Sequence, residues 1–394
     1  MRFMTGEIED KKSVRRKFYF EDSFMDFAFL HILTLHGFQG SEISEIYSAA
    51  SKINENDLDT WRLVWKELAE KVEDIALTAE ERGHNVTARE AYLRAVTYYR
   101  YSSYALRFAD PRFRSTIEKS RTLFQSFAKL SDPPIEIIEI PYEGKTLPGY
   151  FMRPDASGLK RPTIIIGDNT SEELYYWIGP PAVDRGYNVL LVDLPGMGLN
   201  SFNGINYRPD TEVPIKAVID YLFSRNDVDT SRIAVYGGGE TGGYIMTRAT
   251  AYENRIRACI VDPLVLDMES VASHSGGFGP LSIDQTGPDS IGSNIADCVL
   301  MQNGINPKRP LESLKLMKVD ISMINCPVLG LNDSGDNSEL LRQANEAIEN
   351  ISNSATTHMV FTAEEANFYR QLDNFSLKHR VMFDWLDEVF DHQG

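Results

Sequence analysis

The apolar positions of the chain follow two rhythms, and the change falls near residue 131. From residue 18 to about residue 130, apolar and aromatic side chains recur three to four positions apart, which is typical of amphipathic helices. Proline is absent until Pro111, so nothing interrupts long helices in this segment. The pattern predicts a helical N-terminal segment.

After residue 131, short β-rich apolar runs alternate with helical patterns. Two strands joined by a turn at residues 143–145 are followed by six further strands, and the eight predicted strands cover residues 135–140, 149–153, 163–166, 188–192, 233–236, 259–261, 328–331 and 358–361. Helical spacing lies between and after them, at residues 172–185, 213–223, 243–251, 340–351 and 375–390. Continuous apolar strands alternating with helices predict an α/β fold, with a mostly parallel sheet covered on both faces. Catalytic groups in such folds lie at the carboxyl ends of the strands.

We therefore expect a helical cap segment, residues 1–131, and an α/β core, residues 132–394. Residues 274–306, rich in Gly, Ser, Asn and Asp, enter between two strand signals of the core. A loop of this length is uncommon in a compact domain unless it covers something. We interpret the region around residues 270–315, with the N-terminal helices, as a lid over the strand ends. The alternative is a surface insertion.

The composition of the chain argues against several classes of function. The 394 residues include 57 acidic and 40 basic side chains, a net charge of −17, which argues against a nucleic-acid partner. No apolar run approaches the roughly 18 residues that span a bilayer, so we expect no membrane association. The three cysteines, Cys259, Cys298 and Cys326, lack metal-ligand spacing and suit a reducing, cytoplasmic setting. We expect neither a metal nor a cofactor.

The most informative stretch is residues 232–244, RIAVYGGGETGGY. A predicted strand ends at Tyr236, glycines follow, and a helical pattern begins near Gly242. This is the strand–turn–helix pattern of a nucleophile elbow, G-x-S-x-G, in which glycines flank a reactive residue on a strained turn. Residues 238–242 fit that frame with Glu240 in the central position.

The elbow and several motifs around it resemble the α/β-hydrolase fold family. The similarity lies with the branch that has a helical N-terminal segment and includes 2,6-dihydroxypseudooxynicotine hydrolase, the fermentation–respiration switch proteins and polyketide-shortening hydrolases. It covers nearly the whole chain, and its other motifs are EELY at 172–175, RGYNVL at 185–190, DLPGMG at 193–198 and DWL at 384–386. The resemblance implies an α/β-hydrolase core with a cap, a small aromatic or polyketide-like substrate and, by analogy, a homodimer.

The resemblance also assigns site residues, because the family's triad runs Ser, Asp, His along the chain. Glu240 takes the place of the serine. The acid is Asp336, with Asp333 as second choice. The histidine falls within residues 362–374, which contain none, and Tyr369 or its neighbour Phe368 stands there.

Two further groups of residues are candidates for substrate contacts. Asp168 and Asn169 follow the strand 163–166, where the family has its oxyanion loop, and the backbone N–H of Thr241 would complete that oxyanion hole. Tyr98 and Tyr99 belong to a tyrosine-rich stretch of the helical segment. Their rings either pack the helices or line a pocket for a flat ligand.

Three hypotheses about activity follow. The first is a non-hydrolytic enzyme in which Glu240 is the general base or acid for C–C bond formation, cyclisation or isomerisation of a polyketide-like aromatic or β-dicarbonyl substrate, with Tyr369 as proton donor or orienting hydroxyl. The second is a hydrolase or C–C lyase with a triad rebuilt around Glu240. The third is a catalytically dead binding or scaffold protein. A serine-hydrolase mechanism is disfavoured because both the serine and the histidine are missing.

Overall fold

A computed structural model describes residues 17–55, 57–275, 277–278, 281–282, 290–306, 309–366 and 369–391. Within these residues eight strands form one sheet in the order β1-β2-β4-β3-β5-β6-β9-β10. Their bounds are β1 (Glu136–Tyr142), β2 (Lys145–Met152), β3 (Arg161–Ile166), β4 (Asn188–Val192), β5 (Val228–Gly238), β6 (Ala258–Asp262), β9 (Val328–Asp333) and β10 (Thr357–Phe361). Only β1 with β2 and β2 with β4 pair antiparallel. The predicted mostly parallel α/β sheet is confirmed.

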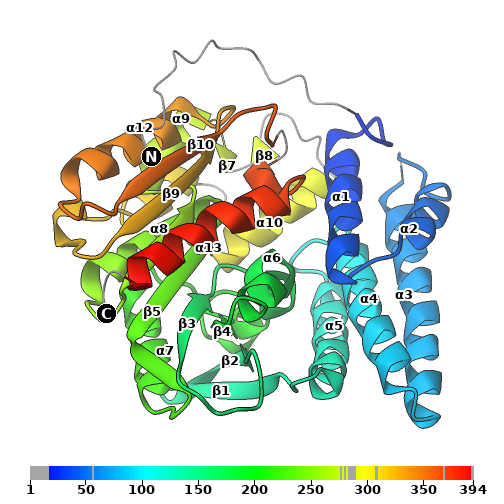
Figure 1. Cartoon of the computed structure of the whole chain (residues 1–394). Coiled ribbons are helices and arrows are strands. Elements are labelled where there is room, and N and C mark those ends of the chain that lie inside the picture. Colours follow the sequence, from blue (N-terminus) through cyan, green and yellow to red (C-terminus); the bar gives the residue numbers. More distant parts are fainter. Residues whose placement is uncertain are drawn as a thin grey trace.

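Helices cover both faces of the sheet, as the continuous apolar strands require (Figure 1). Ile164 and Ile166 of β3 pack in the core cluster that contains α6 (Ser171–Val183) and α13 (Phe375–Asp391). Ile165 faces the opposite way, into the cluster under α7 (Glu212–Phe223), α8 (Gly239–Tyr252) and α12 (Ser338–Asn350). Successive strand residues thus supply two separate cores.

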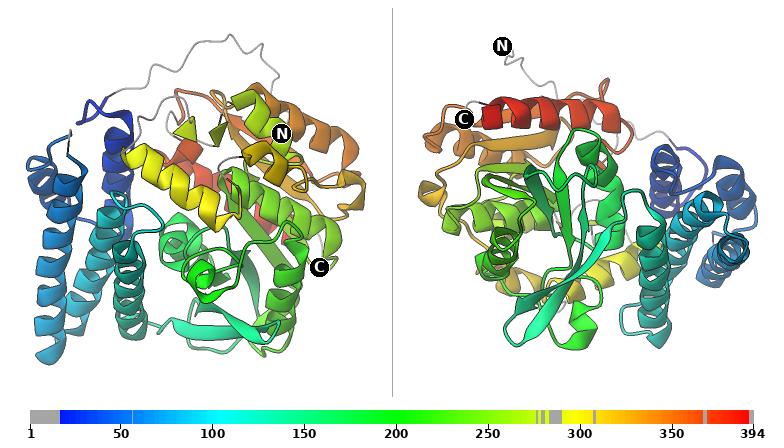
Figure 2. Two further views of the ribbon diagram at one scale, coloured as in Figure 1. Left: turned by 180° about the vertical axis from the view of Figure 1, so that it is seen from behind. Right: turned by 60° about the horizontal axis from the view of Figure 1, so that its bottom comes forward.

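The N-terminal segment is helical as predicted. It forms α1 (Ser23–Thr34), the short turn η1 (Leu35–Phe38), α2 (Ile43–Ala50), α3 (Leu58–Glu81), α4 (Asn85–Ser103) and α5 (Pro111–Leu130). In Figures 1 and 2 these helices stand together at one side of the sheet. Their buried aromatic residues, including Trp61 and Trp65, are continuous with the core of β3, α6 and α13. The division into cap and core at residue 131 stays a prediction.

The expected lid region contains α9 (Met268–Ser275), α10 (Ile291–Gln302) and α11 (Pro310–Leu314). It also contains the two-residue strands β7 (Gly277–Phe278) and β8 (Leu281–Ser282). Residues 276, 279–280, 283–289 and 307–308 of this region lie outside the described residues. Figure 2 shows α10, in yellow, between the N-terminal helices and the core, and α10 contacts α1.

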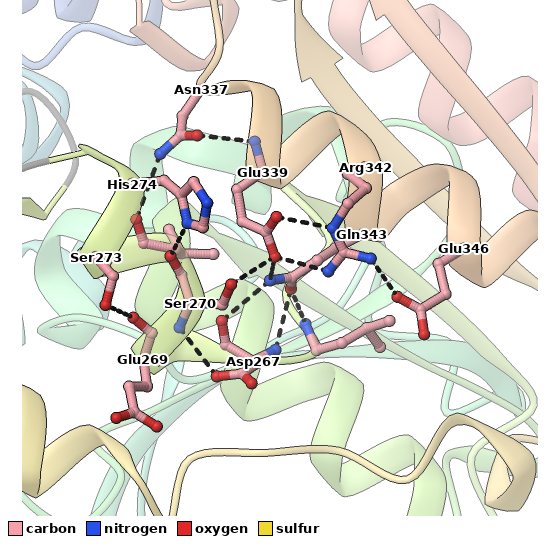
Figure 3. A network of polar contacts seen from close by, with 12 residues as sticks. Asp267, Glu269, Ser270, Ser273, His274, Asn337, Glu339, Arg342, Gln343 and Glu346 are labelled. Atoms are coloured by element: carbon pink, nitrogen blue, oxygen red, sulfur yellow. Dashed lines mark hydrogen bonds and ion pairs between the residues drawn. The ribbon is translucent and has the colours of Figure 1, made fainter.

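A polar network joins the start of α9 to α12 (Figure 3). The side-chain oxygen of Gln343 accepts hydrogen bonds from the backbone N–H groups of Leu266 (2.7 Å) and Asp267 (3.0 Å). Its NH₂ group donates to the carbonyl of Asp267 (3.0 Å) and to Glu339 (2.9 Å). Four hydrogen bonds from one buried amide fix the chain where it leaves β6 and enters the lid region.

None of the helices within the described ranges is long and apolar enough to cross a bilayer. The remaining short turns are η2 (Asn200–Asn203), η4 (Ile321–Met323) and η5 (Tyr369–Gln371). The last of these follows β10 and supplies residues to the candidate site.

Candidate active site

The elbow forms where β5 passes directly into α8. Its glycines are required by close approach, because a Cβ on Gly237 would lie 2.1 Å from the carbonyl oxygen of Gly242. A Cβ on Gly242 would lie 2.1 Å from the carboxylate of Asp168. The left-handed backbone of the turn falls on Gly239, with φ +69°, and Glu240 lies in the first turn of α8. The expectation that Glu240 carries the strained backbone is therefore wrong by one residue, and the strained position has no side chain.

Glu240 nevertheless faces the site. The residue is 8% exposed, and both oxygens of its carboxylate accept hydrogen bonds. One oxygen accepts a hydrogen bond from the guanidinium of Arg370 at 3.0 Å, and the other accepts from the hydroxyl of Tyr369 at 3.1 Å. A Cβ on Gly239 would lie 3.1 Å from the same hydroxyl, so Tyr369 stands in front of the strained turn as well. The alternative to Tyr369, Phe368, lies outside the described residues.

Arg370 is the centre of this network, and the sequence analysis did not single it out. The side chain is 1% exposed and also donates to Asp336 at 2.9 Å, with Asp262 at 3.7 Å. Its backbone is left-handed (φ 55°, ψ 37°), which is uncommon for a residue other than glycine and is concentrated at functional sites. Lys378, fully buried, neutralises the second oxygen of Asp262 at 2.7 Å. The signal in the sequence was a cation next to the predicted histidine position.

The two candidate acids both lie in this network. Asp336 accepts hydrogen bonds from Arg370 and from the side chain of Asn332 (2.8 Å), so its link to Glu240 runs through Arg370 and not through Tyr369. Asp333 accepts from the backbone N–H of Arg370 (3.0 Å) and from the side chain of Gln371 (2.6 Å). Burial, together with the neighbouring carboxylates of Asp262 and Asp336, raises the pKa of Asp333.

The loop after β3 brings a second carboxyl group to the elbow. One oxygen of Asp168 accepts the backbone N–H of Gly238, and the other finds no hydrogen-bond partner among the described residues. Burial raises the pKa of Asp168 to about 7. The side chain of Asn169 accepts from Arg100 of α4 (3.3 Å) and from the N–H of Thr170 (2.8 Å). Thr241 lies at the amino end of α8, which no described side chain caps.

A cavity of about 240 Å³ opens beside these residues. Its volume is close to the lower end of the range for small-molecule pockets. Glu240, Thr241, Tyr369, Asp168 and Asn169 line it, so residues at or after the carboxyl ends of β3 and β5 form part of its wall. The remaining walls come from α1, α4, α5, α6 and α10, and include Phe24, Phe27, His31, Arg100, Tyr104, Phe113, Ile117, Trp177, Ile295, Cys298 and Val299.

Two predicted substrate contacts are corrected. Tyr98 and Tyr99 are not among the described residues that line the cavity. The hydroxyl of Tyr98 donates to Glu45 at 2.6 Å, and that of Tyr99 donates to Glu73 at 2.7 Å, so both rings pack α4 on α2 and α3. The face of α4 that meets the cavity carries Arg100, Ser103 and Tyr104 instead, because these residues are one turn apart.

The histidines of the core are engaged elsewhere. His379 pairs with the carbonyl of Trp177 at 2.8 Å, and His358 pairs with Asn332 at 3.0 Å. His31 of α1 lines the cavity, and no motif in the sequence marks it. Within the described part of the chain, no group of three or more His, Cys, Asp or Glu side chains could hold a metal ion.

The chain is similar in sequence and in fold to several known proteins. No protein-family model matches the chain. The α/β hydrolase gkaG of Penicillium citrinum is 40% identical over 262 residues, which cover 62% of this chain and 61% of gkaG. The 20-hydroxy-prefusarin hydrolase FUS2 of Gibberella moniliformis is 34% identical over 61% of this chain and 60% of FUS2. The hydrolase ORFZ of Pyricularia oryzae is 28% identical over 94% of this chain and 98% of ORFZ.

Solved structures show the same fold. The crystal structure of 2,6-dihydroxy-pseudo-oxynicotine hydrolase superposes with a TM-score of 0.73 at 21% identity, over 91% of this chain and 95% of that protein. AbyA5 superposes with a TM-score of 0.62 at 14% identity, over the same shares of the two chains. The chain spans about three fifths of the curated relatives that it matches most strongly, and these relatives are fungal α/β hydrolases of secondary-metabolite pathways. These comparisons show that the chain has the α/β-hydrolase fold.

Proposed function

We propose that the chain is a non-hydrolytic acid–base enzyme of specialised metabolism, which forms, cyclises or isomerises C–C frameworks of a polyketide-like aromatic or β-dicarbonyl substrate. One observation carries the proposal. The strained turn where a nucleophile stands in this fold is Gly239, without a side chain, while the carboxylate of Glu240 beside it lines an open cavity. A site of this kind transfers protons and lacks the side chain that would form an acyl-enzyme.

Glu240 is the general base in this proposal. One carboxylate oxygen accepts a hydrogen bond from Arg370, and the other accepts one from Tyr369. Each oxygen therefore keeps a second lone pair that can accept a proton from the substrate. The proton comes from a carbon next to a substrate carbonyl and moves to the carboxylate, while the electron pair of the C–H bond moves to the carbonyl oxygen as an enolate. Burial and the neighbouring Glu240 raise the pKa of Tyr369, so its phenol keeps the proton and donates.

Asp168 completes the proton chemistry. With its pKa raised to about 7, the carboxyl is largely protonated in mildly acidic solution and can donate from its unpartnered oxygen to the enolate. The N–H of Thr241, at the positive end of α8, adds a second donor. The enolate then adds to an electrophilic carbon or takes its proton back at another carbon, and Glu240 returns the proton to the product.

Hydrolysis or C–C cleavage is the second candidate. The relatives are named hydrolases, and Arg370 joins Glu240 to Asp336 much as a histidine joins the elbow residue to the acid in a triad. In that case Glu240 would activate water, and oxygen from labelled water would enter the product. A scaffold role is less well supported, because the cavity beside the ion pair of Glu240 is open.

The proposal is tested with 2-tetralone, a ketone with an activated C–H beside a fused aromatic ring. We expect the protein to accelerate exchange of the carbon-1 protons in D₂O, followed by NMR, and Glu240→Gln to lower that rate by at least about 100-fold, because a neutral amide is no base. The matched control is Glu212→Gln, which breaks a Glu–Arg pair with Arg248 outside the cavity. Equal exchange by Glu240→Gln and the unmodified protein would refute the proposal.

A further inference from the structure

The N-terminal helices contribute a second group of polar residues to the cavity wall. His31 of α1 lines the cavity and is 5% exposed. Its Nε2 atom is buried and has no hydrogen-bond partner among the described residues. A buried polar atom without a hydrogen-bond partner destabilises the folded protein, that is, it lowers the free energy of unfolding. Such atoms are rare in folded proteins unless a ligand or water pairs with them.

The charged groups around His31 compensate one another. Arg100 of α4 forms an ion pair with Glu173 of α6 and donates to the hydroxyl of Thr170 at 2.6 Å. Burial lowers the pKa of His31, with Glu173 opposing the shift, so the imidazole is neutral near pH 7. The cavity wall around His31 therefore carries polar atoms without a net charge to attract an anion.

The ring of Phe27 lies close to a residue of each polar group. The Phe27 ring lies 6.1 Å from the Tyr369 ring and 6.3 Å from the His31 ring, measured between centroids. Phe27 is therefore a neighbour of both His31 and Tyr369, and Tyr369 in turn donates to Glu240. A ligand that reaches both polar groups needs an apolar body about one ring long, with an oxygen at each side.

We propose that His31 is the anchor of a second substrate subsite, which binds an uncharged oxygen (a hydroxyl, ketone or amide) one ring away from the carbon that Glu240 deprotonates. The assignment rests on the proposed function for the reacting end and goes beyond it in naming the chemistry of the distal end. A neutral imidazole pairs with such a group through its N–H or its lone pair, as the ligand requires. The subsite selects against ligands that lack the distal oxygen, because the Nε2 atom is then left unpaired.

The test compares three probes by isothermal titration calorimetry: 2-tetralone, 6-hydroxy-2-tetralone and the 6-carboxylate of 2-tetralone. We expect the hydroxyl probe to bind at least about 10-fold more tightly than 2-tetralone, and the carboxylate no more tightly than 2-tetralone. His31→Phe should remove the preference for 6-hydroxy-2-tetralone over 2-tetralone, so that the ratio of the two dissociation constants falls to about 1. His31→Gln, which keeps a polar atom at the end of the side chain, should restore part of the preference.

Control variants and measurements distinguish a wrong subsite assignment from a misfolded variant and from a wrong proposed function. His358→Phe, on β10, removes a histidine outside the cavity and should keep the full preference. Circular dichroism and the melting temperature show whether each variant folds, and His31→Gln tests the subsite if His31→Phe does not. A hydroxyl preference that survives both His31 variants, or tighter binding of the carboxylate, would overturn the inference. Exchange of 2-tetralone that is insensitive to Glu240→Gln would overturn the proposed function and leave the binding result standing.

Discussion

The protein contains two polar networks built from similar residues, one around Glu240 beside the cavity and one around Gln343, which Figure 3 shows. Each has a Glu–Arg pair, Glu240 with Arg370 and Glu339 with Arg342. In the Gln343 network all four hydrogen-bonding positions of the amide are used. Elsewhere on the wall of the cavity that Glu240 lines, buried polar atoms of Asp168 and His31 have no partner among the described residues.

The carboxyl groups of the two regions also differ in their pKa values, which indicates a structural role for Glu339 and a chemical role for Asp168. Glu339 has a pKa lowered to about 2, because Arg342 hydrogen-bonds its carboxylate, and so stays charged at any working pH. The pKa of Asp168 is raised to about 7 by burial, where small changes of pH alter its charge. A satisfied network fixes the chain, whereas open polar atoms on a cavity wall are prepared for a ligand.

The largest expected effect on stability comes from replacing Arg370 in the Glu240 network, and replacing Arg342 in the Gln343 network is its matched control. Arg370→Leu leaves Glu240 and Asp336 buried without their cation, and should lower the free energy of unfolding by about 3–5 kcal/mol. Arg342→Leu should cost less than about 1 kcal/mol, because its side chain is 56% exposed and water replaces it. Urea unfolding measures both. Equal losses would show that the Glu240 network is no more dependent on its cation than the surface pair.

Gln343→Leu should affect stability and spare activity. The substitution leaves two backbone N–H groups and one carbonyl without their partner, which we expect to cost about 2–3 kcal/mol. Proton exchange of 2-tetralone, measured well below the melting temperature, should stay within about twofold of the unmodified protein. A loss of exchange without a loss of stability would place the Gln343 network in the catalytic machinery.

The pH dependence of exchange should report Asp168. Because its pKa is raised to about 7, the carboxyl is protonated below pH 7 and loses its proton above it, so the protein-catalysed rate should fall as pH rises from 7 to 9. Asp168→Asn keeps a donor at all pH values and should remove that fall. The uncatalysed exchange is subtracted at each pH. A rate that rises across this range in the unmodified protein would exclude a protonated Asp168 from the reaction.

The smallest expected effect on stability comes from a substitution at Gly239, in the turn between β5 and α8. Gly239→Ala should destabilise the protein by about 1 kcal/mol, since a left-handed φ is unfavourable for alanine, and should also disturb Tyr369, 3.1 Å from the new Cβ. Gly83→Ala is the matched control, with φ +76° and nothing within 4 Å of the added carbon. We expect both variants to lose similar stability and only Gly239→Ala to slow exchange. Normal exchange by Gly239→Ala would mean that Tyr369 does not need its position in front of the turn.

The fold was predictable because its signals are local. Continuous apolar runs such as residues 188–192 and the helical stripes between them predict a covered parallel sheet, and this is what β4 and its neighbours form. The site was only partly accessible. A run of three glycines before Glu240 does not reveal which residue takes the left-handed backbone, and helical spacing alone does not reveal which face of α4 meets a cavity.

Arg370 and His31 show what a single sequence hides. Arg370 reaches Glu240 across 130 residues of chain, and His31 reaches the cavity because α1 forms part of the cavity wall. Neither residue belongs to a motif, and their importance lies in contacts made only in the folded chain. The cation beside Tyr369 could have been weighed as a partner for Glu240, whereas His31 had no signal beyond its place in an apolar stripe.

The most direct test of the central claim compares proton exchange with ester hydrolysis in one preparation. Exchange of 2-tetralone in D₂O and cleavage of 2-naphthyl acetate are followed in parallel, for the unmodified protein and for Glu240→Gln. The account predicts catalysed exchange that depends on Glu240, and ester cleavage no faster than the uncatalysed rate. Cleavage of the ester that depends on Glu240, without catalysed exchange, would contradict it and establish Glu240 as part of a hydrolytic site.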